Sequence, residues 1–132
     1  MPLIVHWEQM QEKGTLYDGL IEFSDFYATL AEMTGQTELN IDGISFYGLL
    51  SGGTHIARES AFVHYDPHWG RFEPARFAQT VNYKLYDSGN FYDILFDPEE
   101  KMPIKENDLS IHEKEIRDLL QKELDEAPEW GE

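Results

Sequence analysis

Three short aromatic-rich segments constrain the fold of this chain most. They cover residues 76–80, 83–87 and 91–95, and typical turn residues such as Ser88-Gly89-Asn90 separate them. Connections this short join antiparallel strands, because a parallel pair needs a crossover of roughly a dozen residues or more. Together with the apolar residues 61–63, the segments predict an antiparallel meander.

Apolar residues recur at helical spacing in two further stretches. The first begins at an N-cap, Ser24 or Asp25, and ends at Gly35. Its apolar residues are Phe26, Tyr27, Leu30, Ala31 and Met33. The second begins with a capping box of Ser110 and Glu113. Its apolar residues are Ile116, Leu119, Leu120 and Leu124. We expect this second helix to pack on the meander.

The N-terminus carries a short continuous apolar run, Leu3-Ile4-Val5, directly after Pro2. Such a run is typical of a strand that is buried on both faces in a parallel sheet. No other part of the sequence has the pattern of a strand-helix-strand crossover, so we expect the partners of this strand to lie outside the chain. The sequence therefore predicts an α+β fold, with a short antiparallel sheet, a packed C-terminal helix, and an N-terminal strand and amphipathic helix at the edge of a larger sheet.

The composition argues against several classes of partner. The chain has 26 acidic and 10 basic residues and a formal net charge of −16. Scattered basic residues do not provide the phosphate contacts of nucleic-acid binding. The absence of cysteine excludes disulfides and thiolate metal sites. No stretch approaches the ~20 apolar residues of a membrane helix, and no signal peptide is recognisable. We therefore expect neither nucleic acid nor membrane as a partner.

An ordered series of short phrases runs through almost the whole sequence. The phrases occupy residues 2–7, 25–35, 41–46, 83–85 and 91–100. In this order and spacing they resemble the C-terminal third of type I sulfatases, the arylsulfatase-like enzymes of the alkaline-phosphatase superfamily. The resemblance implies sulfuric ester hydrolysis for a complete protein.

The resemblance also implies how the chain is divided and which catalytic groups it lacks. Residues 1–60 would supply the terminal strand, helix and loop of the large α/β sulfatase domain, and residues 61–132 its C-terminal subdomain. Complete sulfatases use a calcium ion and a formylglycine made within a Cys/Ser-x-Pro-x-Arg motif, and they are often exported. No such motif occurs here. We therefore expect no catalytic residue, metal ligand or cofactor in this chain itself.

The loop after the first predicted strand carries the candidate substrate contacts. By the resemblance it lies near the mouth of the sulfatase pocket, where Trp69 would stack on a sugar ring and Arg71 would pair with an anion. The candidate substrate-binding residues are His64, Tyr65, His68, Trp69 and Arg71. Two alternatives stay open. His64, Asp66 and His68 are also a possible ligand set for a transition metal, and the loop is also explained by hydrogen bonds to its own backbone.

Three other polar residues have structural explanations. Asp25 is a candidate catalytic acid, but an N-cap explains it without further assumption. We interpret Lys84 as a strand residue whose aliphatic stem covers apolar surface. We interpret Asp97 as the cap of a turn and not as part of an acidic metal-binding loop. The acidic residues around it lack the ligand spacing and central glycine of an EF-hand.

Three functional hypotheses follow. The first is the C-terminal portion of a sulfatase, which is inactive by itself. The second is a stand-alone module that binds an anionic saccharide or serves in assembly. The third is half of a split sulfatase that is completed in trans. The expected partners are the missing N-terminal sulfatase region, or a second copy held through the exposed N-terminal strand and helix. A sulfated saccharide is the expected ligand of the complete enzyme.

Overall fold

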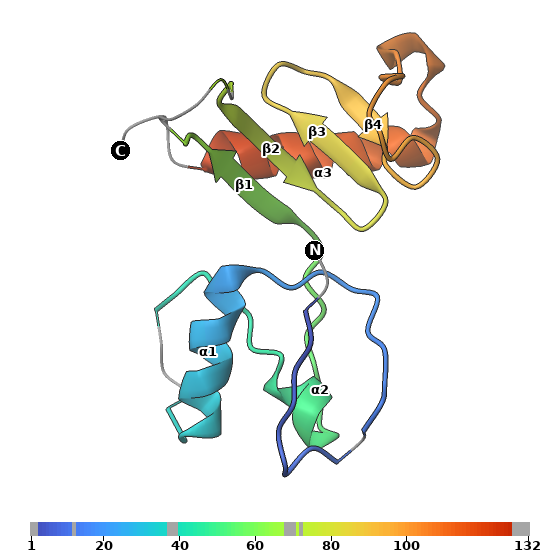
Figure 1. The fold of residues 1–132 in the computed structure, drawn as a ribbon. Helices are drawn as coiled ribbons and strands as arrows, with labels where there is room; N and C mark the ends of the chain where they lie inside the picture. Colours follow the sequence, from blue (N-terminus) through green and yellow to red (C-terminus); the bar gives the residue numbers. More distant parts are fainter. Residues whose placement is uncertain (1–2, 12, 37–39, 68–70, 72, 128–132) are drawn as a thin grey trace. The chain divides into compact units, whose positions relative to one another are not determined.

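The chain folds into two compact units. The structure is a computed structural model, and it describes residues 3–11, 13–36, 40–67, 71 and 73–127. The units are Met1–Arg58 (the N-terminal unit) and Glu59–Glu132 (the C-terminal unit). Figure 1 colours both along the sequence. Their assignment to the large domain and the C-terminal subdomain of a sulfatase stays a prediction.

The C-terminal unit contains the antiparallel meander that the sequence predicts. Its strands lie side by side in sequence order in one four-stranded sheet (Figure 1). They are β1 (Ala61–Tyr65), β2 (Ala75–Gln79), β3 (Tyr83–Tyr86) and β4 (Phe91–Asp93). The last strand ends earlier than expected, because Asp93 Oδ1 accepts hydrogen bonds from the backbone N–H groups of Leu95 and Phe96 at 3.0 and 3.1 Å. These bonds turn the chain out of the ladder.

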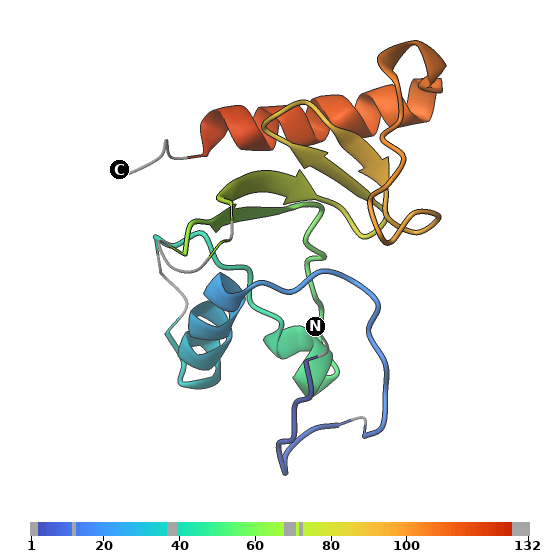
Figure 2. The same cartoon turned by 45° about the horizontal axis from the view of Figure 1, so that its top comes forward.

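The core of the C-terminal unit lies between the sheet and α3 (Ile111–Glu126). Figure 2 shows α3 running across one face of the sheet. Ala78 pairs with Phe62 on one side and with Leu85 on the other, so these three side chains share the face that α3 covers. The buried cluster consists of Ala78, Leu85, Phe91, Leu109, Leu120 and Leu124. The packing of the C-terminal helix on the meander is therefore confirmed.

α3 begins at the predicted capping box, after a short 3-10 helix, η1 (Glu106–Asp108). Ser110 Oγ accepts a hydrogen bond from the backbone N–H of Glu113 at 3.2 Å, and the Glu113 carboxylate accepts one from the backbone N–H of Ser110 at 2.8 Å. These bonds satisfy N–H groups that a helix start leaves without a partner. They also lower the pKa of Glu113, which keeps its carboxylate an acceptor at neutral pH.

The described part of the N-terminal unit contains the helices α1 (Phe23–Met33) and α2 (Tyr47–Ser51), which contact each other. The other segments described in this unit are irregular apart from an isolated antiparallel bridge between Leu20 and Arg58. The unit is therefore held by loop contacts more than by regular pairing.

Both ends of α1 can be compared with the prediction. The helix stops where expected, because Gly35 follows the C-cap Thr34 with a φ of +83°, a conformation that glycine adopts without strain. Its start was predicted wrongly. The N-cap is Glu22, and Asp25 is the third helical residue, whose carboxylate completes a capping box with the backbone of Glu22.

Leu3-Ile4-Val5 does not form a strand in this structure. Among the described residues it has no partner in a β-ladder, and Ile4 is 89% exposed. A strand of a parallel sheet needs a neighbour to hydrogen-bond, and the described residues provide none for this segment. The predicted N-terminal strand is thus absent, while the α+β class and the sheet-and-helix arrangement are confirmed. None of the helices in the described ranges is long and apolar enough to span a membrane.

Candidate functional site

The candidate contacts at the end of β1 lie on opposite faces of the sheet. In the β1–β2 ladder, His64 pairs with Arg76 and Tyr65 pairs with Ala75. His64 shares the α3-covered face with Phe62, and the two rings meet edge to face with centroids 6.5 Å apart. Tyr65 is 42% exposed and belongs to the helix-free face. One ligand can touch both side chains only by reaching around the end of the strand.

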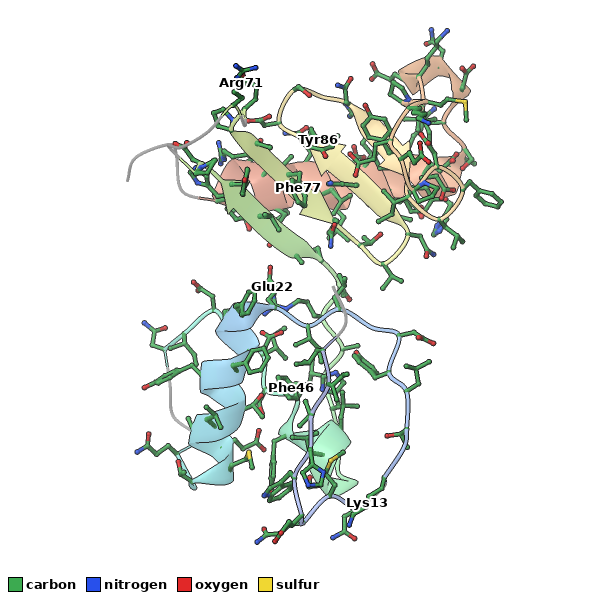
Figure 3. The ribbon with its side chains drawn as sticks, in the orientation of Figure 1. Lys13, Glu22, Phe46, Arg71, Phe77 and Tyr86 are labelled. Atoms are coloured by element: carbon green, nitrogen blue, oxygen red, sulfur yellow. The ribbon has the colours of Figure 1, made fainter. Side chains whose placement is uncertain are left out.

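Arg71 is the third candidate contact that the structure describes. It is exposed in the connection between β1 and β2, and Figure 3 shows its side chain pointing away from the sheet. A guanidinium group in such a position offers paired N–H donors to a sulfate or carboxylate. His68 and Trp69 lie outside the described residues, so their roles remain predictions. Among the residues with a described position, no three histidine, aspartate or glutamate side chains gather where they could hold a metal ion.

A second polar cluster surrounds Lys84 on the helix-free face. Lys84 Nζ lies 3.9 Å from the centroid of the Phe77 ring and 4.7 Å from that of Tyr86. The same ammonium forms an ion pair with Glu100 at 2.7 Å, and the Tyr86 hydroxyl donates a hydrogen bond to Glu100 at 2.5 Å. Figure 3 shows Phe77 and Tyr86 on neighbouring strands. The cluster fastens the segment after β4 to the sheet.

The ionisation of this cluster favours a structural role. Burial disfavours the charged form of Lys84, but its hydrogen bonds to Glu100 and Tyr86 outweigh burial, and the pKa of Lys84 is raised. Burial and the bond to Glu100 raise the pKa of Tyr86. A protonated amine is no nucleophile and a neutral phenol is no base. The ammonium instead holds Glu100, whose φ of +53° is unfavourable for a residue with a side chain.

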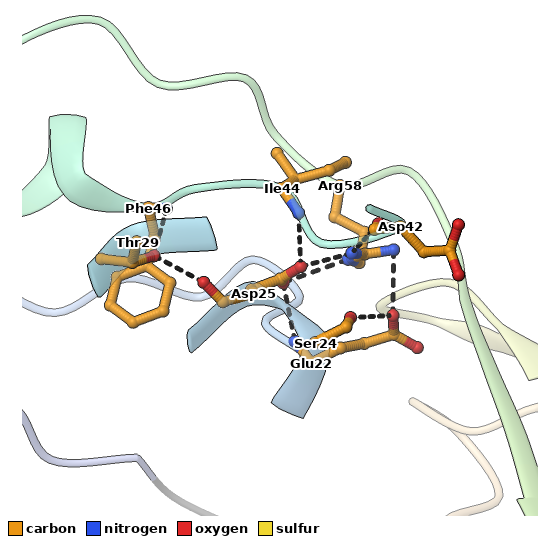
Figure 4. Close-up of polar contacts among 8 residues, drawn as sticks. All are labelled: Glu22, Ser24, Asp25, Thr29, Asp42, Ile44, Phe46 and Arg58. Carbon is orange, nitrogen blue, oxygen red and sulfur yellow. Dashed lines mark hydrogen bonds and ion pairs between the residues drawn. The ribbon is translucent and has the colours of Figure 1, made fainter. Parts of the chain in front are cut away.

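Asp25 is the centre of a buried polar network in the N-terminal unit (Figure 4). Its carboxylate accepts hydrogen bonds from the backbone N–H groups of Glu22 at 2.8 Å and Ile44 at 2.7 Å. Arg58 donates to both carboxylate oxygens, from Nε at 3.2 Å and from Nη2. Arg58 Nη1 forms a further ion pair with Glu22 at 3.0 Å. Such bidentate, charge-assisted pairs are stronger than neutral hydrogen bonds, and this pair ties the start of α1 to the last residue of the unit.

Two further features hold the loop before α2 against α1. The Thr29 hydroxyl donates a hydrogen bond to the backbone carbonyl of Asp25 at 2.7 Å and accepts one from the backbone N–H of Phe46 at 3.0 Å. Gly43 passes so close to the helix that a Cβ there would lie 2.2 Å from the carbonyl oxygen of Ser24. A residue with a side chain would force the loop away, so this close approach requires glycine.

The network makes Asp25 a structural carboxylate. Burial raises its pKa, but the hydrogen bonds from Arg58, Glu22 and Ile44 outweigh burial, so the pKa of Asp25 lies below its ordinary value of 3.8. At neutral pH the group is ionised and its oxygens are occupied by donors, so it has no proton to give as a general acid. The structural explanation given to Asp25 from the sequence is therefore the better one, although its position in the helix differs.

The partners Arg58 and Glu100 were missed at the level of sequence. A buried aspartate needs a cation and donors, so a partner for Asp25 could have been expected once the residue was known to be buried. Nothing in the sequence indicates which of the 10 basic residues supplies it. The position of Glu100 beside Lys84 depends in turn on the fold of the segment after β4.

Comparisons with known proteins find similarity among solved structures. No protein-family model matches the sequence, and no curated protein matches it. Among solved structures, the chain is similar to BT4656, which was determined in complex with its substrate D-glucosamine-2-N,6-O-disulfate. The TM-score is 0.60 and the sequence identity is 25%. The match covers 82% of this chain but 25% of BT4656, so the chain spans about a quarter of the length of this structural neighbour.

The match includes parts of both units. The C-terminal unit alone makes up little more than half of the chain, so a match over 82% of it extends into the N-terminal unit. The ordered phrases of the sequence and the structural match agree with each other. The chain has a sulfatase-like fold, shared with part of a protein whose substrate is a sulfated glucosamine.

Proposed function

We propose that this chain is the C-terminal portion of a sulfatase that acts on a sulfated saccharide. The structural match with BT4656, which binds a disulfated glucosamine as its substrate, is the observation that carries the proposal. The sulfatase-like order of phrases from residue 2 to residue 100 supports it from the sequence alone. The large difference in length between the two chains supports a partial role for this one.

The residues of this chain limit that role. The sequence contains no cysteine and no Cys/Ser-x-Pro-x-Arg motif, so it has no source of formylglycine. Within the described ranges, no cluster of three metal-ligating side chains is available for calcium. The sequence offers no source of formylglycine and the described residues offer no such cluster for calcium, so we assign no catalytic step to this chain. In the proposed enzyme, formylglycine and calcium belong to sulfatase sequence that corresponds to the unmatched three quarters of BT4656. That sequence lies on the same polypeptide or on a second one.

In this proposal, the end of β1 and the following connection contact the saccharide. The exposed Arg71 pairs with a sulfate oxygen through its guanidinium N–H groups. Tyr65 contributes its ring and hydroxyl from the helix-free face, and His64 contributes a ring nitrogen from the other face. His68 and Trp69 complete the proposed set. The β1–β2 ladder holds the two ends of this connection in register, which fixes the span that the loop must bridge.

A titration of the ¹⁵N-labelled chain with D-glucosamine-2-N,6-O-disulfate tests these contacts. We expect amide shifts confined to residues 64–71 and weak affinity, on the order of 1 mM, because few contacts are available. Arg71→Gln should weaken binding about tenfold, the equivalent of ~1.4 kcal/mol for a charge-assisted hydrogen bond. Lys122→Gln is the matched control, because it removes one positive charge from an exposed position on α3.

Two results would contradict the proposed contacts. One is the absence of shifts at residues 64–71 at saturating sugar. The other is an equal response to unsulfated glucosamine, which would show that sulfate is not recognised. If this chain binds the sugar but no sulfate is released when the catalytic part of a sulfatase is added, the stand-alone binding module is favoured instead.

A further inference from the structure

Arg76 is a buried cation at the base of the connection between β1 and β2. It is 7% exposed, and it is the second residue of β2, close behind that connection. Its partner in the ladder is His64, so the two side chains share the face of the sheet that α3 covers. A charged side chain is rarely buried unless hydrogen bonds or other charges compensate it. The contacts of Arg76 therefore show what its charge holds in place.

The guanidinium of Arg76 meets the C-terminal end of α3. Its Nη2 donates hydrogen bonds to the backbone carbonyl oxygens of Leu124 at 3.3 Å and Ala127 at 3.4 Å. Carbonyls at the C-terminus of a helix lack partners within the helix and form the negative end of its dipole, so a cation is stabilising there. The last turn of α3 contains no basic residue of its own. Arg76 supplies this cation from the sheet.

Arg76 also contacts β1. Its Cζ lies 5.5 Å from the centroid of the Phe62 ring, within the range of a cation–π interaction. The Phe62 ring in turn meets the His64 ring edge to face. Figure 1 shows the C-terminal end of α3 on the same side of the unit as the end of β1 and the start of β2. One side chain on β2 therefore joins the end of α3 to the strand that leads into the connection.

A second link between β1 and α3 lies at the other end of the strand. The Ser60 hydroxyl donates a hydrogen bond to the Glu123 carboxylate at 2.7 Å, and Ser60 is 8% exposed. Ser60 directly precedes β1, whereas His64 and Tyr65 are its last two residues. The two links therefore fasten opposite ends of one strand. Because the Arg76 link is the one beside the proposed saccharide contacts, the Ser60 link provides a matched control.

We propose that Arg76 is a positioning residue of the proposed saccharide site. The inference rests on the proposed function and extends it to a buried residue outside the set of sugar contacts. Arg76 fixes the end of β1 and the start of β2 against α3, and so it holds both ends of the connection that carries Arg71. A site that is ordered before its ligand arrives costs less to bind. Arg76 thus strengthens sugar binding through its neighbours.

The sugar titration, repeated on variants of the whole chain, tests this role. Arg76→Met keeps an unbranched side chain but removes the charge and the donors, and it should weaken binding of D-glucosamine-2-N,6-O-disulfate about fivefold. Arg76→Lys keeps a cation that can bond the last carbonyls of α3, so it should restore most of the affinity. Ser60→Ala removes the link at the other end of β1 and should leave the affinity within about twofold.

A double-mutant cycle separates positioning from a general loss of stability. If Arg76 acts through Arg71, Arg71→Gln should weaken binding about tenfold in the original chain but about twofold in the Arg76→Met background. The effect shrinks because a misplaced guanidinium already contributes little. An equal loss in both backgrounds would overturn the proposal. Weakening by Ser60→Ala that matches Arg76→Met would also overturn it, because both substitutions would then act by destabilising the unit.

Amide relaxation recorded without sugar gives a readout that does not depend on the proposed function. The amides of Arg71 and Glu73 should be less ordered in Arg76→Met than in the original chain, while those of β3 stay unchanged. Arg76→Gln, which loses the charge but keeps an N–H donor, replaces Arg76→Met if that variant does not fold. Unchanged order at both amides overturns the positioning role, whether or not the sugar binds. Loss of order in a chain that does not bind the sugar contradicts the proposed function alone.

Discussion

The two units of this chain are stabilised in opposite ways. The C-terminal unit encloses an apolar cluster between a regular sheet and α3, and its polar groups form caps and a clamp at the surface. The N-terminal unit buries an ion pair, Asp25–Arg58, and leaves the apolar side chains of Phe23, Tyr27 and Leu30 on α1 exposed. An apolar core is largely insensitive to pH and charge, whereas a buried ion pair depends on both partners. The comparison therefore predicts that the two units respond differently to the same perturbation.

Removal of the cation from the buried network should have the largest effect. Arg58→Met leaves the Asp25 carboxylate buried without its partner, at a cost of about 3 to 5 kcal/mol. Amide hydrogen exchange should show loss of protection in α1 while α3 remains protected. Lys122→Met, which breaks an ion pair between two exposed side chains, is the control and should change little. Equal loss of protection in both units would remove the distinction between them.

A cavity in the apolar cluster should have the opposite effect, with loss of protection in the C-terminal unit and not in α1. Leu120 is fully buried against the sheet, so Leu120→Ala should cost about 2 to 5 kcal/mol and lower protection in α3 and β3. Leu119→Ala changes the neighbouring residue of the same helix, which is 36% exposed, and should cost clearly less. The measurement is urea unfolding followed by hydrogen exchange. A similar cost for both variants would show that the cluster is not the core.

Acid should separate the two units without any substitution. The folded-state pKa of Asp25 is lowered, so its ionised form stabilises the folded N-terminal unit at pH values above its ordinary pKa of 3.8. This contribution is lost as the pH falls below that value and through the lower folded-state pKa. Amide spectra recorded from neutral pH downward should show α1 losing structure before the β-sheet. Simultaneous loss would indicate that other carboxylates control acid unfolding.

Loss of a single helix cap should have the smallest effect. Ser110→Ala removes the hydroxyl that accepts the Glu113 N–H, which should cost about 1 kcal/mol, confined to the C-terminal unit. Ser88→Ala in the exposed β3–β4 turn is the control. Thermal unfolding by circular dichroism measures both. An unchanged midpoint for Ser110→Ala would mean that water replaces the cap at no cost.

The sequence predicts the C-terminal unit well because its signals are local. Strand alternation, the turn at Gly89 and the box of Ser110 and Glu113 each act within a few residues. The N-terminal unit depends on contacts that local patterns do not encode. Asp25 meets Arg58 from 33 positions away, and the loop reaches α1 only because Gly43 has no side chain. The N-cap of α1 was therefore misplaced.

The candidate site was predicted from resemblance alone, and its geometry could not follow from sequence. The alternation of a strand places His64 and Tyr65 on opposite faces, which becomes informative only once α3 is known to cover one of them. The clamp between Lys84 and Glu100 likewise needs the path of the segment after β4. Chemistry carried by side chains from several elements is specified by the fold and not by any one segment.

Sulfate release by the purified chain tests the central claim most directly. The chain is incubated with calcium and D-glucosamine-2-N,6-O-disulfate, and free sulfate is measured by ion chromatography. We expect no release above buffer, because the chain supplies neither formylglycine nor a calcium cluster among its described residues. Release that is proportional to protein, survives repurification and falls with Arg71→Gln would contradict the claim, and would place a complete active site within these 132 residues.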